Sequence, residues 1–215
     1  MNTCGECYSD KIADTHSQGA GVARVLANSN SGNMAVALLA RDPSNLSKLC
    51  DDLRKSTNGG VLHSFPTDTS PPSLSKAFKD IAAHPDFNGL KLKLAIYHVK
   101  HSSKKPFLEE TPELFGESLQ IYTTGAFAFA QEAVRMMYAQ NGGETSLSDT
   151  NGEKKGTIIF TGTLGALRTN PEFYAYGAGR AGVRMIAQGL AKEVSKNGIH
   201  VSHPFPHGDS TVRGA

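Results

Sequence analysis

Three side chains in the last quarter of the chain have the types and the spacing that proton transfer requires. Thr163 stands thirteen residues before Tyr176, and Arg180 stands four residues after Tyr176. Four residues make about one turn of a helix, so the phenol and the guanidinium are expected on one helical face. A free tyrosine has a pKa of about 10, and a fixed cation beside it stabilises the phenolate. The three groups could therefore deliver a proton to an oxygen atom that the threonine hydroxyl holds in place.

A glycine-rich segment near the start of the chain could bind a phosphate. Residues 15–21 read THSQGAG, and apolar residues at helical spacing follow them. A glycine-rich turn that leads into a helix brings the backbone close to a phosphate and points free N–H groups at it. An ordinary loop before a helix gives the same pattern, so the motif leaves both interpretations open. The candidate cofactor-binding residues of this segment are Ser17, Gln18, Gly19 and Gly21.

Strand and helix patterns alternate along the rest of the chain. Apolar runs typical of strands in a parallel sheet occupy residues 34–42, 61–68, 92–99, 156–160 and 199–203. Apolar residues at helical spacing occupy residues 43–58, 71–84, 112–138 and 172–196. This alternation predicts an α/β fold with a doubly wound, Rossmann-like parallel sheet between two layers of helices.

The domain organisation follows from the same pattern. We expect residues 1–215 to form a single dinucleotide-binding domain. Residues 1–14 carry little periodic pattern and are expected to be poorly ordered, because the segment before the glycines lacks the Val/Ile/Leu run of a central first strand. Residues 141–156 are polar and rich in glycine, which indicates an exposed loop, and residues 204–215 are interpreted as a C-terminal tail.

In the order of these segments, their spacing and their residues, positions 15–211 resemble the short-chain dehydrogenase/reductase family. The resemblance implies that Tyr176 is the catalytic tyrosine, that Thr163 takes the place of the catalytic serine, and that Arg180 takes the place of the catalytic lysine. It implies an oxidoreductase that transfers a hydride between a nicotinamide cofactor and a carbonyl or alcohol substrate.

The resemblance also implies which cofactor is bound. Arg41 ends the predicted strand at 34–42, where family members that use NADP carry an arginine for the 2′-phosphate. Asp68 matches the aspartate that contacts the adenine ring. NADP is therefore expected in preference to NAD.

Several family motifs are altered in this chain. Thr15 replaces the first glycine of the phosphate motif, and residues 97–100 read YHVK where the family has NNAG. Tyr122 stands in place of the relay asparagine, and residues 206–211 correspond to the segment that contacts nicotinamide, with His207 in place of its glycine. These changes motivate a second hypothesis, in which the protein is a catalytically silent relative that serves as a binding or assembly partner.

Composition and charge bound the remaining possibilities. The 215 residues carry a net charge of +2 with scattered Lys and Arg, which argues against a nucleic-acid partner. No apolar run reaches the ~20 residues that span a membrane, and three cysteines without a signal sequence favour a cytoplasmic setting. No metal ligands are assigned. The Cys4/Cys7 pair has no second pair of ligands at a useful spacing, and neither the group His200, His203 and His207 nor the pair His98 and His101 is interpreted as a metal site. The resemblance implies a homodimer or tetramer formed through the helices at 112–138 and 172–196.

Overall fold

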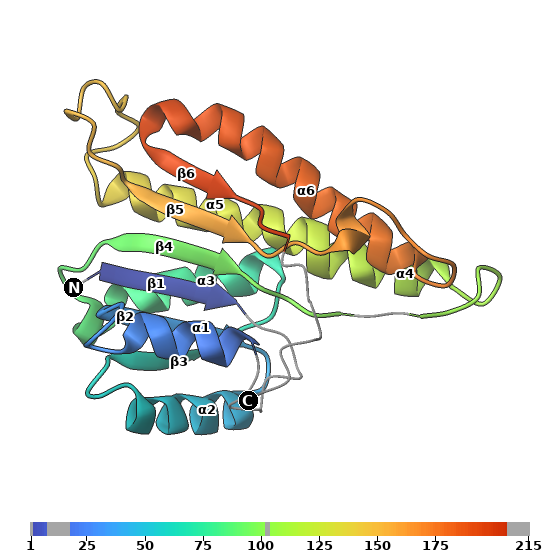
Figure 1. Cartoon of the computed structure of the whole chain (residues 1–215), viewed down its shortest axis with the longest axis horizontal. Coiled ribbons are helices and arrows are strands. Elements are labelled where there is room, and N and C mark those ends of the chain that lie inside the picture. Colours follow the sequence, from blue (N-terminus) through green and yellow to red (C-terminus); the bar gives the residue numbers. More distant parts are fainter. Residues whose placement is uncertain (1, 8–17, 102–103, 206–215) are drawn as a thin grey trace, which may run out of the picture.

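The computed structural model describes residues 2–7, 18–101 and 104–205, and its centre is a six-stranded parallel sheet (Figure 1). The strand order is β3-β2-β1-β4-β5-β6, so the chain moves outward from β1 to one edge and then from β4 to the other. This is the doubly wound topology that the alternating pattern predicts. The strands are β1 Asn2–Cys7, β2 Met34–Ala40, β3 Leu62–Pro66, β4 Leu92–Tyr97, β5 Gly156–Phe160 and β6 Ile199–Ser202.

Helices connect the strands and form two layers around the sheet. They are α1 Gln18–Ala27, α2 Pro43–Ser56, α3 Pro71–Ala83, α4 Pro112–Leu119, α5 Gly125–Ala139 and α6 Tyr174–Val194, with short turns η1 Pro85–Phe87, η3 Leu164–Ala166 and η4 Ser195–Asn197. One buried cluster joins α1 and α2 to the sheet, and a second joins α3, α5 and α6 to its other face. The predicted three-layer α/β/α arrangement is confirmed.

The first strand corrects the prediction for the start of the chain. Residues 1–14 were expected to lack regular structure, yet Asn2–Cys7 form the central strand β1. β1 pairs in parallel with β2 on one side and with β4 on the other. Ladder hydrogen bonds join backbone groups only, so two flanking strands can hold a segment whose side chains give no strand signal.

The long helix predicted over 112–138 is interrupted. It begins as expected, because Thr111 accepts a hydrogen bond from the N–H of Leu114 at 3.3 Å and Pro112 occupies the first turn. Between α4 and α5, however, Gln120–Thr124 form a π-helical turn, η2. A π turn adds a residue to the helical repeat and changes the direction in which side chains point. The side chain most affected is Tyr122, which is fully buried.

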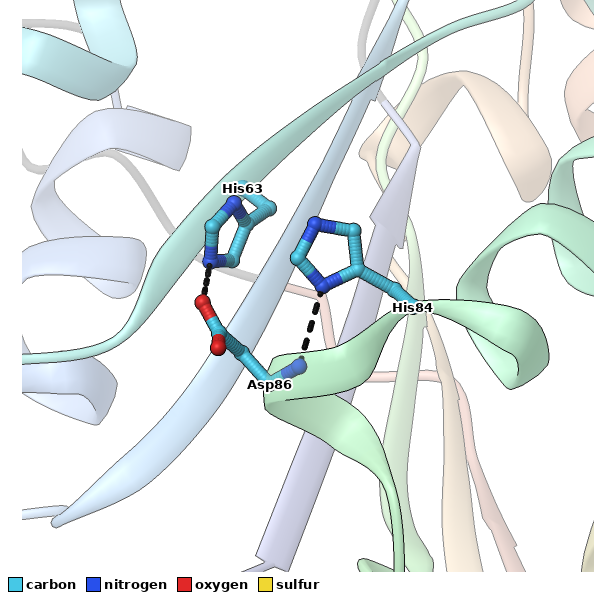
Figure 2. Close-up of side chains that lie close together, drawn as sticks. All are labelled: His63, His84 and Asp86. Carbon is cyan, nitrogen blue, oxygen red and sulfur yellow. Dashed lines mark hydrogen bonds and ion pairs between the residues drawn. The ribbon is translucent and has the colours of Figure 1, made fainter.

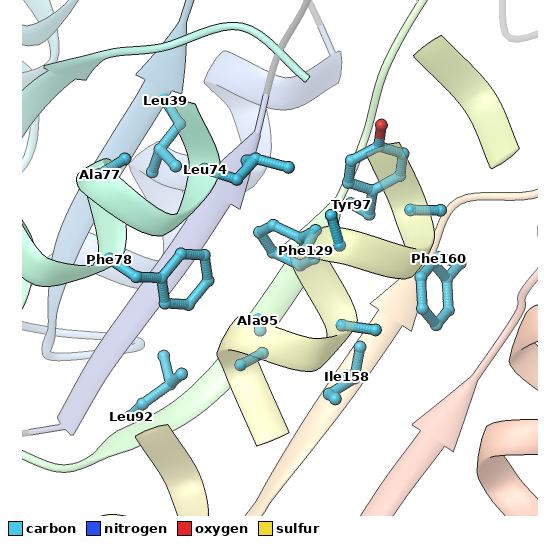
Figure 3. Packing of buried hydrophobic residues seen from close by; sticks show 14 of the residues in the cluster. Leu39, Leu74, Ala77, Phe78, Leu92, Ala95, Tyr97, Phe129, Ile158 and Phe160 are labelled. Carbon is cyan, nitrogen blue, oxygen red and sulfur yellow. The ribbon is translucent and has the colours of Figure 1, made fainter. Parts of the chain in front are cut away.

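Aromatic side chains fill the larger core cluster. The ring of Phe129 from α5 lies 5.5 Å from that of Phe78 on α3 and 5.3 Å from that of Tyr97 on β4 (Figure 3). These T-shaped and tilted ring contacts pack α5 against α3 and the sheet. Cys50 lies in the other cluster as a buried core residue, as its helical position predicts, and burial raises the pKa of its thiol. None of the helices in the described residues is long and apolar enough to cross a membrane.

Candidate active site

The predicted proton-transfer residues lie together beyond the carboxyl ends of β4 and β5. Thr163 follows β5, and Tyr176 and Arg180 project from the first two turns of α6. In open parallel sheets, ligands bind in the crevice outside these strand ends, at the point where the strand order reverses. The spacing of thirteen and four residues therefore does bring the three side chains to one place.

The two hydroxyls are in direct contact. Thr163 Oγ1 and Tyr176 Oη lie 2.9 Å apart, and either can donate to the other. Thr163 Oγ1 also accepts a hydrogen bond from the N–H of Gly165 at 3.2 Å, which holds the threonine rotamer at the start of η3. Both side chains are half-buried.

The guanidinium of Arg180 donates hydrogen bonds to backbone carbonyls. Its Nη1 donates to the carbonyl of Thr161 at 3.0 Å, and its Nη2 donates to the carbonyl of Val99 at 2.9 Å. The side chain is only 7% exposed, and its buried Nε has no hydrogen-bond partner among the described residues. The guanidinium thus ties the segment after β4 to the segment after β5.

Tyr122 completes the site, and it is absent from the set of site residues inferred from the sequence. The Arg180 guanidinium lies 4.4 Å from the centre of the Tyr122 ring and 5.4 Å from that of Tyr176. The Tyr122 hydroxyl accepts from the N–H of His101 at 2.7 Å and donates to the carbonyl of the same residue. Burial raises the pKa of the Tyr122 phenol. The sequence offered one signal for this role, because Tyr122 corresponds to the relay asparagine. The π turn that contains Tyr122 could not be predicted from the sequence.

His98 lies beside this group. Its Nδ1 is 3.1 Å from Thr161 Oγ1, so the hydrogen bond links the ends of β4 and β5 a second time. Burial lowers the pKa of the imidazole, and the charge of Arg180 lowers it further. A neutral imidazole therefore occupies part of the place where the family motif has amide side chains.

The predicted cofactor residues lie along the same edge of the sheet. Gln18 and Gly19 begin α1, and Arg41 and Asp68 directly follow β2 and β3. Hydrogen bonds from Ser70, chiefly from its hydroxyl at 2.5 Å, hold the pKa of the Asp68 carboxyl below its ordinary value, and the charge of Arg41 adds to the effect. Arg41 and Asp68 thus lie close enough to interact.

Two parts of the predicted cofactor site lie outside the described residues. These are Ser17 with the rest of 15–17, and residues 206–211. Within the described part, a Cβ added at Gly21 would meet no atom within 4 Å. Packing against the described residues therefore does not require a glycine there.

The comparison of the sequence with known families decides the lineage. The family described as short chain dehydrogenase matches residues 15–211. The chain belongs to this family. Short-chain dehydrogenases are oxidoreductases that use nicotinamide cofactors, and the doubly wound fold of this chain is the family fold. No curated protein matches the sequence.

Solved structures of short-chain dehydrogenases share the fold at low identity. A short chain dehydrogenase from Mycobacterium smegmatis superposes with a TM-score of 0.77 at 16% identity, over 95% of this chain and 76% of that one. L-sorbose reductase from Gluconobacter frateurii, solved with NADPH and L-sorbose, gives 0.75 at 16% identity over 94% and 68%. NAD⁺-bound xylitol dehydrogenase gives 0.71 at 21% identity over 95% and 70%. The similar structures include one with NADPH and one with NAD⁺.

Proposed function

We propose that the protein is an NADP-preferring short-chain oxidoreductase acting on a carbonyl or alcohol substrate. The observation that supports this most directly is the 2.9 Å contact between the Thr163 and Tyr176 hydroxyls beyond the carboxyl end of β5. A phenol and a second hydroxyl that face the same space can hold one substrate oxygen between them.

The chemistry assigned to the chain is proton transfer and positioning. NADPH supplies the hydride for carbonyl reduction. Tyr176 donates its phenolic proton to the substrate oxygen as that oxygen gains charge, and Thr163 donates a hydrogen bond that orients it. Arg180 is the electrostatic partner beneath the phenol, 5.4 Å from the ring centre. In the reverse direction Tyr176 takes the proton from the alcohol.

The proposed cofactor contacts follow the sheet edge from β1 to β3. Ser17, Gln18, Gly19 and Gly21 would face the phosphates at the start of α1, where free N–H groups favour an anion. Arg41 would hold the 2′-phosphate, and Asp68 the adenine. Arg41 is exposed and directly follows β2, where a guanidinium could meet a 2′-phosphate.

NADPH binding tests this proposal directly. Titration of the whole protein with NADPH, followed by nicotinamide fluorescence, is expected to saturate, and Arg41→Asp is expected to weaken NADPH binding at least tenfold while NADH binding is kept. Asp42→Asn serves as a neighbouring control that changes charge at the cap of α2. A flat titration of folded protein with both cofactors would rule the proposal out.

A second function is favoured by the contacts of Arg180. Because its two terminal nitrogens donate to backbone carbonyls, the residue acts as a structural brace between β4 and β5. This supports the alternative of a catalytically silent relative that works by binding a partner. Arg180→Lys distinguishes the two: a large gain in carbonyl reduction favours the oxidoreductase, and no gain together with no cofactor binding favours the silent relative.

We further propose that α5 and α6 form a homodimer or tetramer interface. A groove of about 480 Å³ runs between these helices, and it includes Phe127 and Met185 in its lining. These two apolar side chains are 52% and 54% exposed in the single chain. A second copy of the chain would cover both.

A further inference from the structure

Two histidines and an aspartate gather at a place that the proposed reaction does not use. His63 lies near the start of the edge strand β3, His84 ends α3, and Asp86 lies in η1 (Figure 2). The candidate active site lies beyond the carboxyl ends of the strands, whereas this cluster lies toward the amino end of β3. It is the one group of three or more potential metal ligands found in the described residues.

The three side chains offer their ligand atoms to a common point. One nitrogen from each imidazole and one carboxylate oxygen all lie within 4.8 Å of one another. His63 Nε2 donates to Asp86 Oδ2 at 2.7 Å, and the backbone N–H of Asp86 donates to His84 Nδ1 at 3.3 Å. Atoms that share a tetrahedral zinc ion at about 2.0–2.2 Å stand roughly 3.4 Å apart, so small side-chain rotations would complete the geometry.

Aromatic packing holds both imidazoles in place. The His63 and His84 ring centres are 4.1 Å apart, and Phe87 lies 5.6 Å from the first and 5.3 Å from the second. Asp86 is 56% exposed, so an ion can enter from solvent.

We infer that His63, His84 and Asp86 form a binding site for a divalent transition-metal ion, with Zn²⁺ as the best fit. Two imidazoles and one carboxylate are ligands that zinc accepts, and a water completes a four-coordinate site. The ion would join the edge strand β3 to the connection between α3 and β4. The site would therefore contribute to the stability of the fold, and it is independent of the proposed oxidoreductase activity.

The positive charge of Arg54 lies next to the proposed site and should repel a bound cation, which provides a separate test. Arg54 Nη2 lies 3.4 Å from His63 Nδ1, although Asp51 pairs with the same guanidinium at 2.9 Å. Zinc on Nε2 requires the imidazole proton at Nδ1, where it would face the donor groups of Arg54. Removal of that charge by Arg54→Gln is therefore expected to tighten zinc binding several-fold.

The test measures Zn²⁺ binding to the whole protein by competition with a chromophoric chelator, and ion content after dialysis. The variants are His63→Gln, His84→Asn and Asp86→Asn, chosen because amide side chains can keep the hydrogen bonds inside the cluster. Each is expected to weaken binding at least tenfold and to lose one ion per chain, and to lose the rise in Tm that zinc gives the unaltered protein.

Two control variants separate this site from other histidines and acids. His200→Asn changes an exposed histidine on β6, and Asp80→Asn changes an exposed carboxylate that pairs with Lys76 at 2.6 Å. Both are expected to bind zinc as the unaltered protein does. The inference is overturned if the unaltered protein binds no zinc at micromolar concentration, or if the three cluster variants retain its affinity and ion content.

Discussion

Arg180 differs from the expected lysine in the number of backbone oxygens that it can bind at once. The planar guanidinium of Arg180 donates to the carbonyls of Val99 and Thr161 from two separate nitrogens. A lysine has a single ammonium nitrogen at the end of a flexible chain and is suited to one such contact. The same guanidinium lies 4.4 Å from the centre of the Tyr122 ring and 5.4 Å from that of Tyr176. At this position, structural bracing and electrostatic support of the phenol depend on one side chain.

Replacement of Arg180 is expected to destabilise the fold. Arg180→Met removes the guanidinium donors to the carbonyls of Val99 and Thr161 and should lower the free energy of unfolding by about 2–5 kcal/mol, and Arg180→Lys by about 1–2 kcal/mol. Chemical denaturation measures both. Arg135→Met on α5, whose pair with Glu132 is on the surface, should change it by less than about 0.5 kcal/mol. Equal effects at 180 and 135 would contradict the bracing role.

Tyr176 carries the proposed proton transfer, and its loss should affect rate more than binding. Tyr176→Phe removes the donor but keeps the ring, so kcat for carbonyl reduction should fall by about 10²–10⁴ while NADPH affinity stays the same. Thr163→Ser keeps the hydroxyl and should retain most activity, whereas Thr163→Val should not. Steady-state kinetics of the four proteins checks this, and unchanged kcat in the phenylalanine variant would refute the assignment.

At the scale of elements, the approach of η2 to α6 decides where the site residues lie. A Cβ added at Gly179 of α6 would lie 2.7 Å from Tyr122 Cδ2 and 3.0 Å from its Cβ. The glycine therefore allows the π turn to place Tyr122 directly against α6. The Tyr122 ring placed in this way is the one that the Arg180 guanidinium stacks over, at 4.4 Å from its centre.

Two glycines on α6 make a matched pair for this contact. Gly179→Ala should lower the free energy of unfolding by about 1–3 kcal/mol, because Tyr122 is fully buried and has no room to move. Gly189→Ala meets no atom within 4 Å and should raise it by up to about 1 kcal/mol through helix propensity. Urea denaturation should show changes of opposite sign in the free energy of unfolding of the two variants. A stabilising effect of Gly179→Ala would show that η2 does not pack against Gly179.

At the scale of the whole molecule, partly buried histidines couple stability to pH. Burial, as the largest cause, lowers the pKa of His63, His98 and His203 from the ordinary value of 6.5. As the pH falls below 6.5, the unfolded chain takes up protons that the folded chain does not, so the free energy of unfolding decreases. Well above 6.5 both states are neutral at these positions and the effect vanishes.

His98→Asn should reduce this dependence on pH. The amide can keep the bond to Thr161 but does not titrate, so the loss of stability between about pH 7 and pH 5 should be shallower than in the unaltered protein. Denaturation curves at a series of pH values measure the slope. His200→Asn, at an exposed position, should leave the slope unchanged; identical slopes for both variants would show that His98 is not the buried neutral group.

The proposed interface between copies also belongs to this scale. A double change, Phe127→Glu with Met185→Glu, places charges in the groove between α5 and α6 and should convert the assembly to monomers. Analytical ultracentrifugation measures the mass in solution. Lys192→Glu tests whether a charge change on α6 that is not in the groove lining leaves assembly intact. An assembly that survives the double change would place the interface elsewhere.

The sequence by itself determined the fold class and the lineage, because both depend on patterns that repeat along the chain. Apolar runs such as 34–40 and 156–160 identify strands wherever both faces of a sheet are covered. A fixed spacing on a helix, as between Tyr176 and Arg180, places side chains on one face without any tertiary information. The contact of Thr163 with Tyr176 is different, because it joins the turn after β5 to α6 and depends on how these elements pack.

Only the tertiary structure decided what depends on neighbours distant in sequence. Asn2–Cys7 become the central strand through backbone pairing with β2 and β4, although their side chains carry no strand pattern. The π turn at Tyr122 and the grouping of His63 with His84 and Asp86 likewise depend on packing between separate elements. Arg180 stands where a sequence match places the catalytic lysine, but its partners at Val99 and Thr161 are set by the convergence of two strand ends. Spacing along a helix determines which side chains share a face, whereas long-range packing determines which atoms of other elements each side chain contacts.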